Sequence, residues 1–228
     1  MTIFDKALEN YGFHHELYSI NDSRIKQLNN LTKILNENFP FDVINSIETG
    51  GSHTWKDGMV GYYFAYLSHL TQGQFSSVDI NPSIEDKVPQ SYFKLNPDLK
   101  INHITDDSIN YLKTISYVPN LVHLDSYNLD LKNPFPSALH GWREFIAIED
   151  KMPVDSIIVI DDNYFGNMWV DWYVGDYDKK EILEINYPIV GKGSLIYHFV
   201  EGGGSNWEKI SNNFCGNNNK IAFRKIKK

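Results

Sequence analysis

The sequence has a single cysteine, Cys215, in 228 residues, and no apolar run that approaches the length of a membrane span. One cysteine excludes a disulfide bond within the chain and a cysteine-rich zinc site. A helix that crosses a bilayer needs roughly 20 consecutive apolar residues, and the amino terminus lacks the basic-then-apolar order of a signal peptide. These absences favour a soluble protein of the cytoplasm that has no contact with a membrane.

Positive charge is also scarce, because 21 lysines and arginines stand against 29 acidic residues and give a formal net charge of −8. Such a surface repels the phosphates of nucleic acids and of anionic membranes, so we expect neither as a partner. The length suits one domain with additions. We expect residues 1–40 to form a helical extension or cap and residues 41–228 to form the main domain. Whether the chain forms a homo-oligomer stays open.

Two short apolar runs end abruptly in carboxylates. The run 121–124 is followed by Asp125, and the run 156–160 is followed by Asp161, Asp162 and Asn163. Such runs are typical of strands buried on both faces of a parallel sheet, and the segment 137–151 between them has helical character. Ligands of open parallel sheets bind outside the carboxyl ends of the strands. The acids therefore predict a site for a divalent cation such as Mg²⁺, or for a polar substrate.

An earlier segment has the order strand, glycine turn, helix, strand and acid. A strand over 43–48, which ends in Glu48, leads into a turn that contains Gly50, Gly51 and Ser52. Two glycines let the backbone turn tightly and approach a ligand closely. A helix over 58–71 and a strand over 74–78 follow. Asp79 then stands where an acid accepts hydrogen bonds from a ribose diol, so the segment predicts nucleoside binding.

A further strand, over 100–104, is followed by Asp107 and Ser108 and then by a helix over 109–116. These two side chains are placed to reach an adenine edge. They are also preferred helix caps, and the two roles are compatible. Residues 220–226 alternate apolar and basic side chains, which suits an antiparallel edge strand. The sequence thus predicts an α/β fold: a Rossmann-like, doubly wound, mostly parallel sheet with helices on both faces and an antiparallel C-terminal edge strand.

These motifs resemble those of class I S-adenosylmethionine-dependent methyltransferases over roughly residues 43–224. IETGGS resembles the glycine-rich first motif, SVDINP the second motif with Asp79 as the ribose-binding acid, and ITDDS the turn that contacts adenine. The resemblance implies that S-adenosylmethionine binds at Glu48 to Ser52, at Asp79, and at Asp107 and Ser108. The first motif departs from the family pattern, because Ser52 follows Gly51 without the usual third glycine and the interval to Asp79 is long.

VHLDS and IIVIDDN resemble later strand ends of the metal-dependent O-methyltransferases that act on sugars, natural products or catechols. In those families an Asp after the fourth strand and an Asp-Asp or Asp-Asn pair after the fifth hold Mg²⁺. The resemblance thus implies Mg²⁺ ligands at Asp125, at Asp162, and at either Asp161 or Asn163. It also implies that the methyl acceptor is a hydroxyl of a small molecule or sugar.

Methyl transfer from a sulfonium to a hydroxyl requires a group that removes the hydroxyl proton. His140, with Glu144 one helical turn later, is a candidate base, because histidine ordinarily titrates near neutral pH. A structural or surface role is the alternative for His140. Asp125 and Asp161 complete the predicted catalytic set, since a metal that they hold would orient the acceptor oxygen. Lys192, which lies between two glycines, is interpreted as a turn residue.

Two other functions are compatible with the sequence. The irregular glycine motif suits a nucleoside-binding protein that has lost turnover and serves as an interaction partner. The acids suit another metal-dependent enzyme on the same scaffold, such as a hydrolase or a hydroxylase-like protein. Cofactor binding separates a methyltransferase from such an enzyme, and product formation separates it from the non-enzymatic protein. Aromatic residues gather over 164–177, as a substrate wall or lid or as a packed flap.

Overall fold

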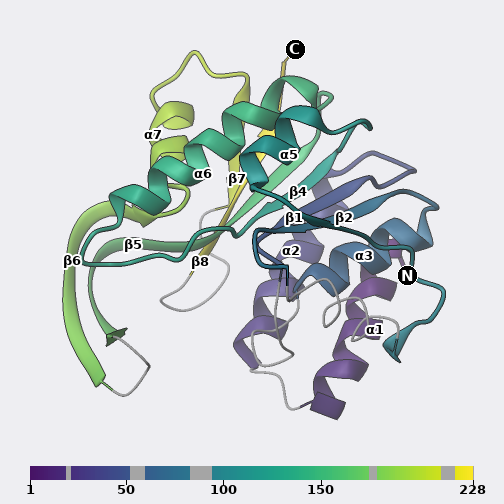
Figure 1. Cartoon of the computed structure of the whole chain (residues 1–228), viewed down its shortest axis with the longest axis horizontal. Coiled ribbons are helices and arrows are strands. Elements are labelled where there is room, and N and C mark those ends of the chain that lie inside the picture. The colour runs from purple at the N-terminus through teal and green to yellow at the C-terminus, as the bar shows by residue number, and fades with distance from the viewer. Residues whose placement is uncertain (19–21, 52–59, 83–93, 175–178, 212–218, 228) are drawn as a thin grey trace.

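The computed structural model describes residues 1–18, 22–51, 60–82, 94–174, 179–211 and 219–227 (Figure 1). The helices are α1 (Ile3–Tyr18), α2 (Asp22–Asn38), α3 (Val60–Leu70), α5 (Ser108–Thr114), α6 (Phe135–Ile148), the 3₁₀ turn η2 (Glu149–Lys151) and α7 (Ser194–Glu201). The strands are β1 (Ser46–Thr49), β2 (Phe75–Asp79), β3 (Asn102–Thr105), β4 (Leu121–Leu124), β5 (Ile157–Val174), β6 (Lys179–Gly191), β7 (Trp207–Ser211) and β8 (Asn219–Lys225).

The strands form one mixed sheet in the order β3-β2-β1-β4-β5-β8-β7, with β6 paired to β5 off this path. Strands β3, β2, β1, β4 and β5 run parallel, while β8 is antiparallel to both β5 and β7. The predicted fold class is confirmed. The final strand is antiparallel, as predicted, but its expected place at the edge is wrong. Strand β7, which the sequence pattern did not indicate, pairs with its outer side.

Side chains of the central strands alternate between two apolar cores, because successive residues of a strand point to opposite faces of a sheet. Ile157 and Val159 of β5 pack with α1, α2 and α3. Ile158 and Ile160 pack with α5, α6 and α7. Figure 1 shows these two groups of helices on opposite faces of the sheet. Cover on both faces explains why β4 and the first part of β5 read as apolar runs.

Helices α1 and α2 lie within the first 40 residues, and both belong to the first of these cores. Tyr11 of α1 and Leu28 and Leu31 of α2 are fully buried there. The hydroxyl of Tyr62 in α3 donates a hydrogen bond to Asn10 Oδ1, at 2.8 Å. The N-terminal helices are therefore part of the layer that covers one face of the sheet. Among the residues described, no helix is both long and apolar enough to cross a membrane.

Strand β5 is much longer than the apolar run from which it was predicted. It continues to Val174 and pairs with β6 from the Asn163–Gly191 pair outward, with a register shift between Phe165 and Gly166. Figure 1 shows this hairpin reaching away from the sheet and its helices. Residues 164–174 of the aromatic segment lie in this hairpin. Residues 175–177 of the segment are outside the described part of the chain.

Candidate active site

A cavity of about 430 Å³ opens at the carboxyl ends of the parallel strands. Its wall is built from the carboxyl ends of β1 to β4, from β5 just beyond its parallel pairing with β4, from the start of α5, from His140 in α6 and from the loop after β6. Lining residues include Gly50, Asp79, Ser108, Asp125, His140 and Lys192. Cavities of this size hold small molecules and cofactors, and this is the end of the sheet at which ligands of such folds bind.

Gly50 makes the turn that brings β1 against the end of β4. Its φ is +73°, a left-handed conformation that glycine adopts without strain. A Cβ atom at this position would lie 2.5 Å from the carbonyl oxygen of Asp125. The amide of Gly50 donates to the carbonyl of Val78 at 2.9 Å. Gly50 and Gly51 both line the cavity, and Ser52 lies outside the described residues.

The acids expected to meet a nucleoside also line this cavity. Asp79 ends β2, and one of its carboxylate oxygens accepts a hydrogen bond from the Asn81 amide at 2.7 Å. Asp107 caps α5, because its side chain accepts from the Asn110 amide at 3.0 Å. Asp107 and the next residue, Ser108, both contribute to the cavity wall. The helix-capping role of Asp107 is therefore present, and it leaves the residue at the cavity.

A polar network that includes Ser108, Ser126 and Glu144 surrounds His140 in α6. The Ser108 hydroxyl lies 3.1 Å from His140 Nε2, and Glu144 Oε1 lies 3.7 Å from the same nitrogen. The Ser126 hydroxyl donates to Glu144 Oε1 at 2.6 Å. The ring of Tyr127 stacks on the imidazole, with 5.2 Å between the centroids. Tyr127 adopts a φ of 65°, a strained conformation for a bulky residue that is often found at functional sites.

Lys192 is the residue that sequence reasoning missed most clearly. It is buried, and its ammonium lies 2.6 Å from Asp125 Oδ1, 2.9 Å from the Asp125 carbonyl oxygen and 2.8 Å from Asp162 Oδ2. Burial lowers the pKa of Lys192, but the two carboxylates outweigh burial and the net shift is upward. Burial raises the pKa of Asp125 to about 6, although Lys192 acts in the opposite direction. The two carboxylates therefore favour the charged form of Lys192.

Three glycines explain how the loop 191–193 places this lysine. A Cβ on Gly141 of α6 would overlap the carbonyl oxygen of Lys192, and one on Gly191 would overlap the carbonyl oxygen of Asp162. A Cβ on Gly193 would lie 2.9 Å from Asn163 Oδ1. The loop is thus pressed between α6 and the end of β5. The flanking glycines were the available signal, and they indicate close packing as well as a turn.

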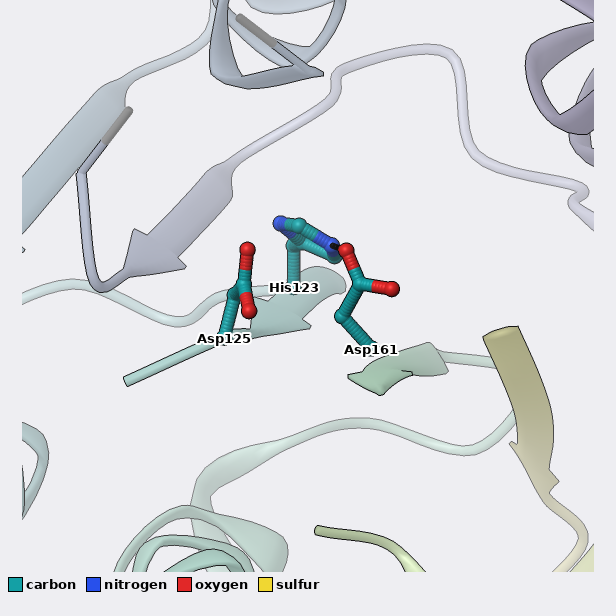
Figure 2. Close-up of side chains that lie close together, drawn as sticks. All are labelled: His123, Asp125 and Asp161. Atoms are coloured by element: carbon teal, nitrogen blue, oxygen red, sulfur yellow. Dashed lines mark ion pairs between the residues drawn. The ribbon is translucent and has the colours of Figure 1, made fainter. Parts of the chain in front are cut away.

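A second set of charges lies under the cavity, on the face of the sheet that α3 covers. Glu48, His123, Asp161 and Lys220 come from β1, β4, β5 and β8, and all four are buried. His123 Nδ1 lies 3.7 Å from Glu48 Oε1, and the Lys220 ammonium lies 3.1 Å from His123 Nε2 and bonds to Asp161 Oδ2. Figure 2 shows His123 between Asp125 and Asp161 at neighbouring strand ends, with its ion pair to Asp161 dashed.

Burial changes the protonation of this second set. It raises the pKa of Glu48, against the lowering effect of His123 beside it. It lowers the pKa of His123, and the charge of Lys220 adds to this effect. Neither Glu48 nor Asp161 lines the cavity, although both were expected to serve the ligand. Their place follows from the alternation of the strands, since Ile47 and Ile160 point to the opposite core.

Asn163, an expected metal ligand, is held by its own loop. Its amide nitrogen donates to the carbonyls of Ile160 and Asp161, each at 3.0 Å, and its Oδ1 accepts from the Gly193 amide at 2.8 Å. The side chain is fully buried. Asn163 therefore fixes the loop that carries Lys192, and its oxygen, which was expected to serve a metal, bonds to the Gly193 amide.

The remaining donors do not fit Mg²⁺ as they stand. His123, Asp125 and Asp161 offer ligand atoms within 4.8 Å of one another, but Lys220 bonds to His123 and Asp161. Lys192 bonds to Asp125 and to Asp162, two of the acids that line the cavity. A divalent cation at these oxygens would lie against one or two ammonium groups, which is electrostatically unfavourable. The predicted ligands come together in space, but lysines already neutralise them.

No protein-family model matches the sequence, and no curated protein matches it. Several solved structures are similar. Precorrin-6y C5,15-methyltransferase from Geobacter metallireducens has a TM-score of 0.50 and 11% identity, over 84% of this chain and 84% of that one. An rRNA methylase from Streptococcus thermophilus has a TM-score of 0.50 and 13% identity, over 86% and 94%. At such identities the likeness shows the fold and not the substrate. The chain thus has a Rossmann-like methyltransferase fold.

Proposed function

We propose that the chain is an S-adenosylmethionine-dependent methyltransferase that methylates a hydroxyl of a small molecule or sugar. The observation that carries the proposal is the cavity wall. It joins the Gly50 turn, the acid at the end of β2 and the Ser108 turn at one end of a methyltransferase-type sheet, and places a histidine beside them. When bound, S-adenosylmethionine supplies the methyl group as a sulfonium that is open to in-line displacement.

The residues suit the cofactor chemically. Asp79 offers carboxylate oxygen to a ribose diol, and Asp107 and Ser108 offer polar atoms to an adenine edge. The close turn at Gly50 brings main chain, with no side chain, to the same end of the cavity. The acids that line the wall outnumber its lysine, and this balance favours a cationic sulfonium over an anion.

His140 is the proposed base. One of its ring nitrogens accepts the acceptor's hydroxyl proton as the oxygen takes the methyl group, which leaves a methyl ether, S-adenosylhomocysteine and a protonated imidazole. Glu144, 3.7 Å from Nε2, stabilises the imidazolium, while Ser108 and the stacked Tyr127 fix the ring plane. Asp125, which was expected to act through a metal, instead bonds to Lys192 at the cavity wall.

The charge of the chain supports a small, uncharged acceptor. A net charge of −8 and the acids that line the cavity repel the phosphates of RNA. The rRNA methylase among the similar structures therefore does not decide the acceptor. Mg²⁺ has no part in the proposal, because Lys192 and Lys220 are bonded to the oxygens that were expected to hold it. For the same reason, a metal-dependent hydrolase or hydroxylase is the weaker alternative.

The test is calorimetric titration of S-adenosylhomocysteine into wild type, Asp79→Ala and the control Asp98→Ala. Asp98 is an exposed acid away from the cavity wall, so its removal changes the net charge equally. Two lost hydrogen bonds to a charged group, each worth about 1.5–3 kcal/mol, predict affinity at least about 100-fold weaker for Asp79→Ala and wild-type affinity for the control. No binding to wild type would contradict the proposal, as would equal binding to both variants.

Cofactor binding alone does not separate an enzyme from a non-enzymatic nucleoside binder. Transfer of a labelled methyl group from S-adenosylmethionine to a panel of hydroxylated small molecules makes that distinction. We expect His140→Gln to keep S-adenosylhomocysteine affinity and to lose about 10²- to 10⁴-fold in transfer rate, as is typical when a general base is removed. A variant with unchanged transfer would exclude His140 as the base.

A further inference from the structure

We propose that Lys192 is a built-in cation that takes the place of a divalent metal between Asp125, which follows β4, and Asp162 in β5. The acids around it become a metal site only when it is removed. The proposal does not rest on methyl transfer, because it concerns which cation these carboxylates hold. It assigns to Lys192 a role that its place between two glycines did not indicate.

The bonds of Lys192 match the number of its protons. An ammonium has three N–H donors, and three acceptors surround this one: Asp125 Oδ1 at 2.6 Å, the Asp125 carbonyl oxygen at 2.9 Å and Asp162 Oδ2 at 2.8 Å. Asp162 reaches this position with a φ of 54°, a left-handed conformation that aspartate tolerates better than most residues. Three oxygens from two strand ends thus converge on one nitrogen.

Close packing around Lys192 restricts its movement away from these oxygens. Its side chain is buried, and its main chain is packed so closely that Gly141, Gly191 and Gly193 have no room for a Cβ. A metal ion at the same oxygens would either displace a buried, fully bonded ammonium or lie beside it. Both outcomes are costly, because like charges a few ångströms apart repel strongly where water is scarce.

The neighbouring acid is neutralised in the same way. Lys220 bonds to Asp161 and approaches His123, and both it and Asp161 are buried. The amide nitrogen of Asn163 donates to the carbonyl of Asp161, and its amide oxygen accepts from the Gly193 amide. Each residue expected to hold Mg²⁺ therefore bonds to a lysine or to the backbone. This pairing of every acid with a lysine distinguishes a lysine-filled site from a metal site that has relaxed around water.

The distances also say what removal of the lysine creates. Without its ammonium, the three oxygens surround a point that each of them approaches within 2.6–2.9 Å. Small movements bring these oxygens to the roughly 2.0–2.6 Å at which Mg²⁺ and Ca²⁺ bind oxygen, with water filling the remaining positions. Mn²⁺ prefers the same oxygen ligands and is a convenient probe because it is paramagnetic.

The experiment is titration of Mn²⁺ alone into wild type, Lys192→Ala, Lys192→Met and the control Lys209→Ala, followed by the electron paramagnetic resonance signal of free Mn²⁺. Lys209 pairs with Glu201 on the surface, so its removal changes the net charge equally away from the site. We expect no stoichiometric binding to wild type or to the control up to about 1 mM, the weak end of known protein sites. Lys192→Ala should bind one Mn²⁺ with a Kd at least tenfold below this limit of about 1 mM.

Two further measurements keep the proposal open to contradiction. Lys192→Ala combined with Asp125→Asn should lose the gained site, and added Mn²⁺ should raise the melting temperature of Lys192→Ala only. Lys192→Met keeps the packing of the aliphatic stem and replaces Lys192→Ala if that variant does not fold. One Mn²⁺ bound by wild type and lost in Asp125→Asn would overturn the proposal. So would a folded Lys192 variant that gains no binding.

Discussion

At the scale of single residues, the shape of the cavity depends on the close approach of the Gly50 main chain to the Asp125 main chain. Gly50 turns β1 toward the end of β4, where any side chain would meet the carbonyl oxygen of Asp125. That carbonyl also accepts a hydrogen bond from the Lys192 ammonium. A glycine at position 50 is therefore needed for the positions of both Asp125 and Lys192. The other glycine of the turn, Gly51, is buried at the cavity wall.

We expect Gly50→Ala to destabilise the protein more than Gly203→Ala does. Both glycines have similar left-handed φ values, +73° and +81°, so both substitutions cost about 1–3 kcal/mol of backbone strain. Only the Cβ at position 50 meets other atoms, whereas the Cβ at position 203 has none within 4 Å. Overpacking should add about 1–3 kcal/mol at position 50. Urea unfolding of both variants measures the difference, and equal losses would show that the close approach is unimportant.

The sequence indicated the kinds of residue at this site better than their directions. Gly50, Asp79 and Ser108 line the cavity because a turn, a strand end and a helix start fix their positions. Glu48 and Asp161 do not, because a strand residue one place earlier or later faces the other core. Counting residues in twos along each strand would have assigned both acids to the face of α3. Lysine pairing was beyond prediction, since Lys192 and Lys220 are distant in the chain from their acids.

At the scale of elements, helix α6 and the loop before α7 hold each other in place. Gly141 lies inside α6 and packs directly on the carbonyl of Lys192. Glycine in a helix is usually less favourable than alanine, by about 1 kcal/mol. A glycine at this position indicates that the gap between helix and loop matters more than the helix propensity. The same helix carries His140, so the contact couples the proposed base to the lysine.

Alanine at two helical glycines should therefore have opposite effects. Gly12 lies in α1 with no atom near its absent Cβ, and Gly12→Ala should stabilise the protein by about 0.5–1 kcal/mol. Gly141→Ala should destabilise it by about 1–3 kcal/mol, because the new methyl group displaces the loop. Thermal unfolding followed by circular dichroism checks both signs. A stabilising Gly141→Ala would mean that the loop moves aside at little cost.

Elements far from the site were less predictable than those that form it. The parallel strands ended in visible acids or turns, whereas β5 runs on to Val174 because β6 provides a partner along its outer part. Strand β7 carries two apolar residues, Trp207, buried against α6, and Ile210, and their spacing does not alternate, so the pattern was too weak to indicate a strand. Strand pairing of this kind is decided by distant segments, which a local pattern does not contain.

At the scale of the whole molecule, the charge is divided unevenly between the inside and the surface. The chain has eight more acids than lysines and arginines, yet Lys192, Lys220 and Lys225 are buried. Lys225 bonds to the carbonyls of Glu149 and Met152, and the other two bond to carboxylates. Three acids among the described residues, Glu48, Glu144 and Asp161, are buried as well, so the buried charges balance and the net charge of −8 lies outside them. This favours uncharged or cationic ligands at the cavity mouth.

Lys220 links β8 to Asp161 of the central strand β5, and its removal should lower the free energy of unfolding. Lys220→Met leaves Asp161 buried without its cation, and removal of one partner of a buried pair typically costs about 3–5 kcal/mol. Adding Asp161→Asn, which keeps an oxygen for the Asp162 amide, should recover part of this loss because no lone charge remains. The surface pair Lys209–Glu201 gives the comparison, since Lys209→Met should cost less than about 1 kcal/mol. Equilibrium unfolding of the four variants and wild type measures these differences. If the double variant is as unstable as the sum of its two single variants, the two side chains do not interact, and the last strand is held by packing alone.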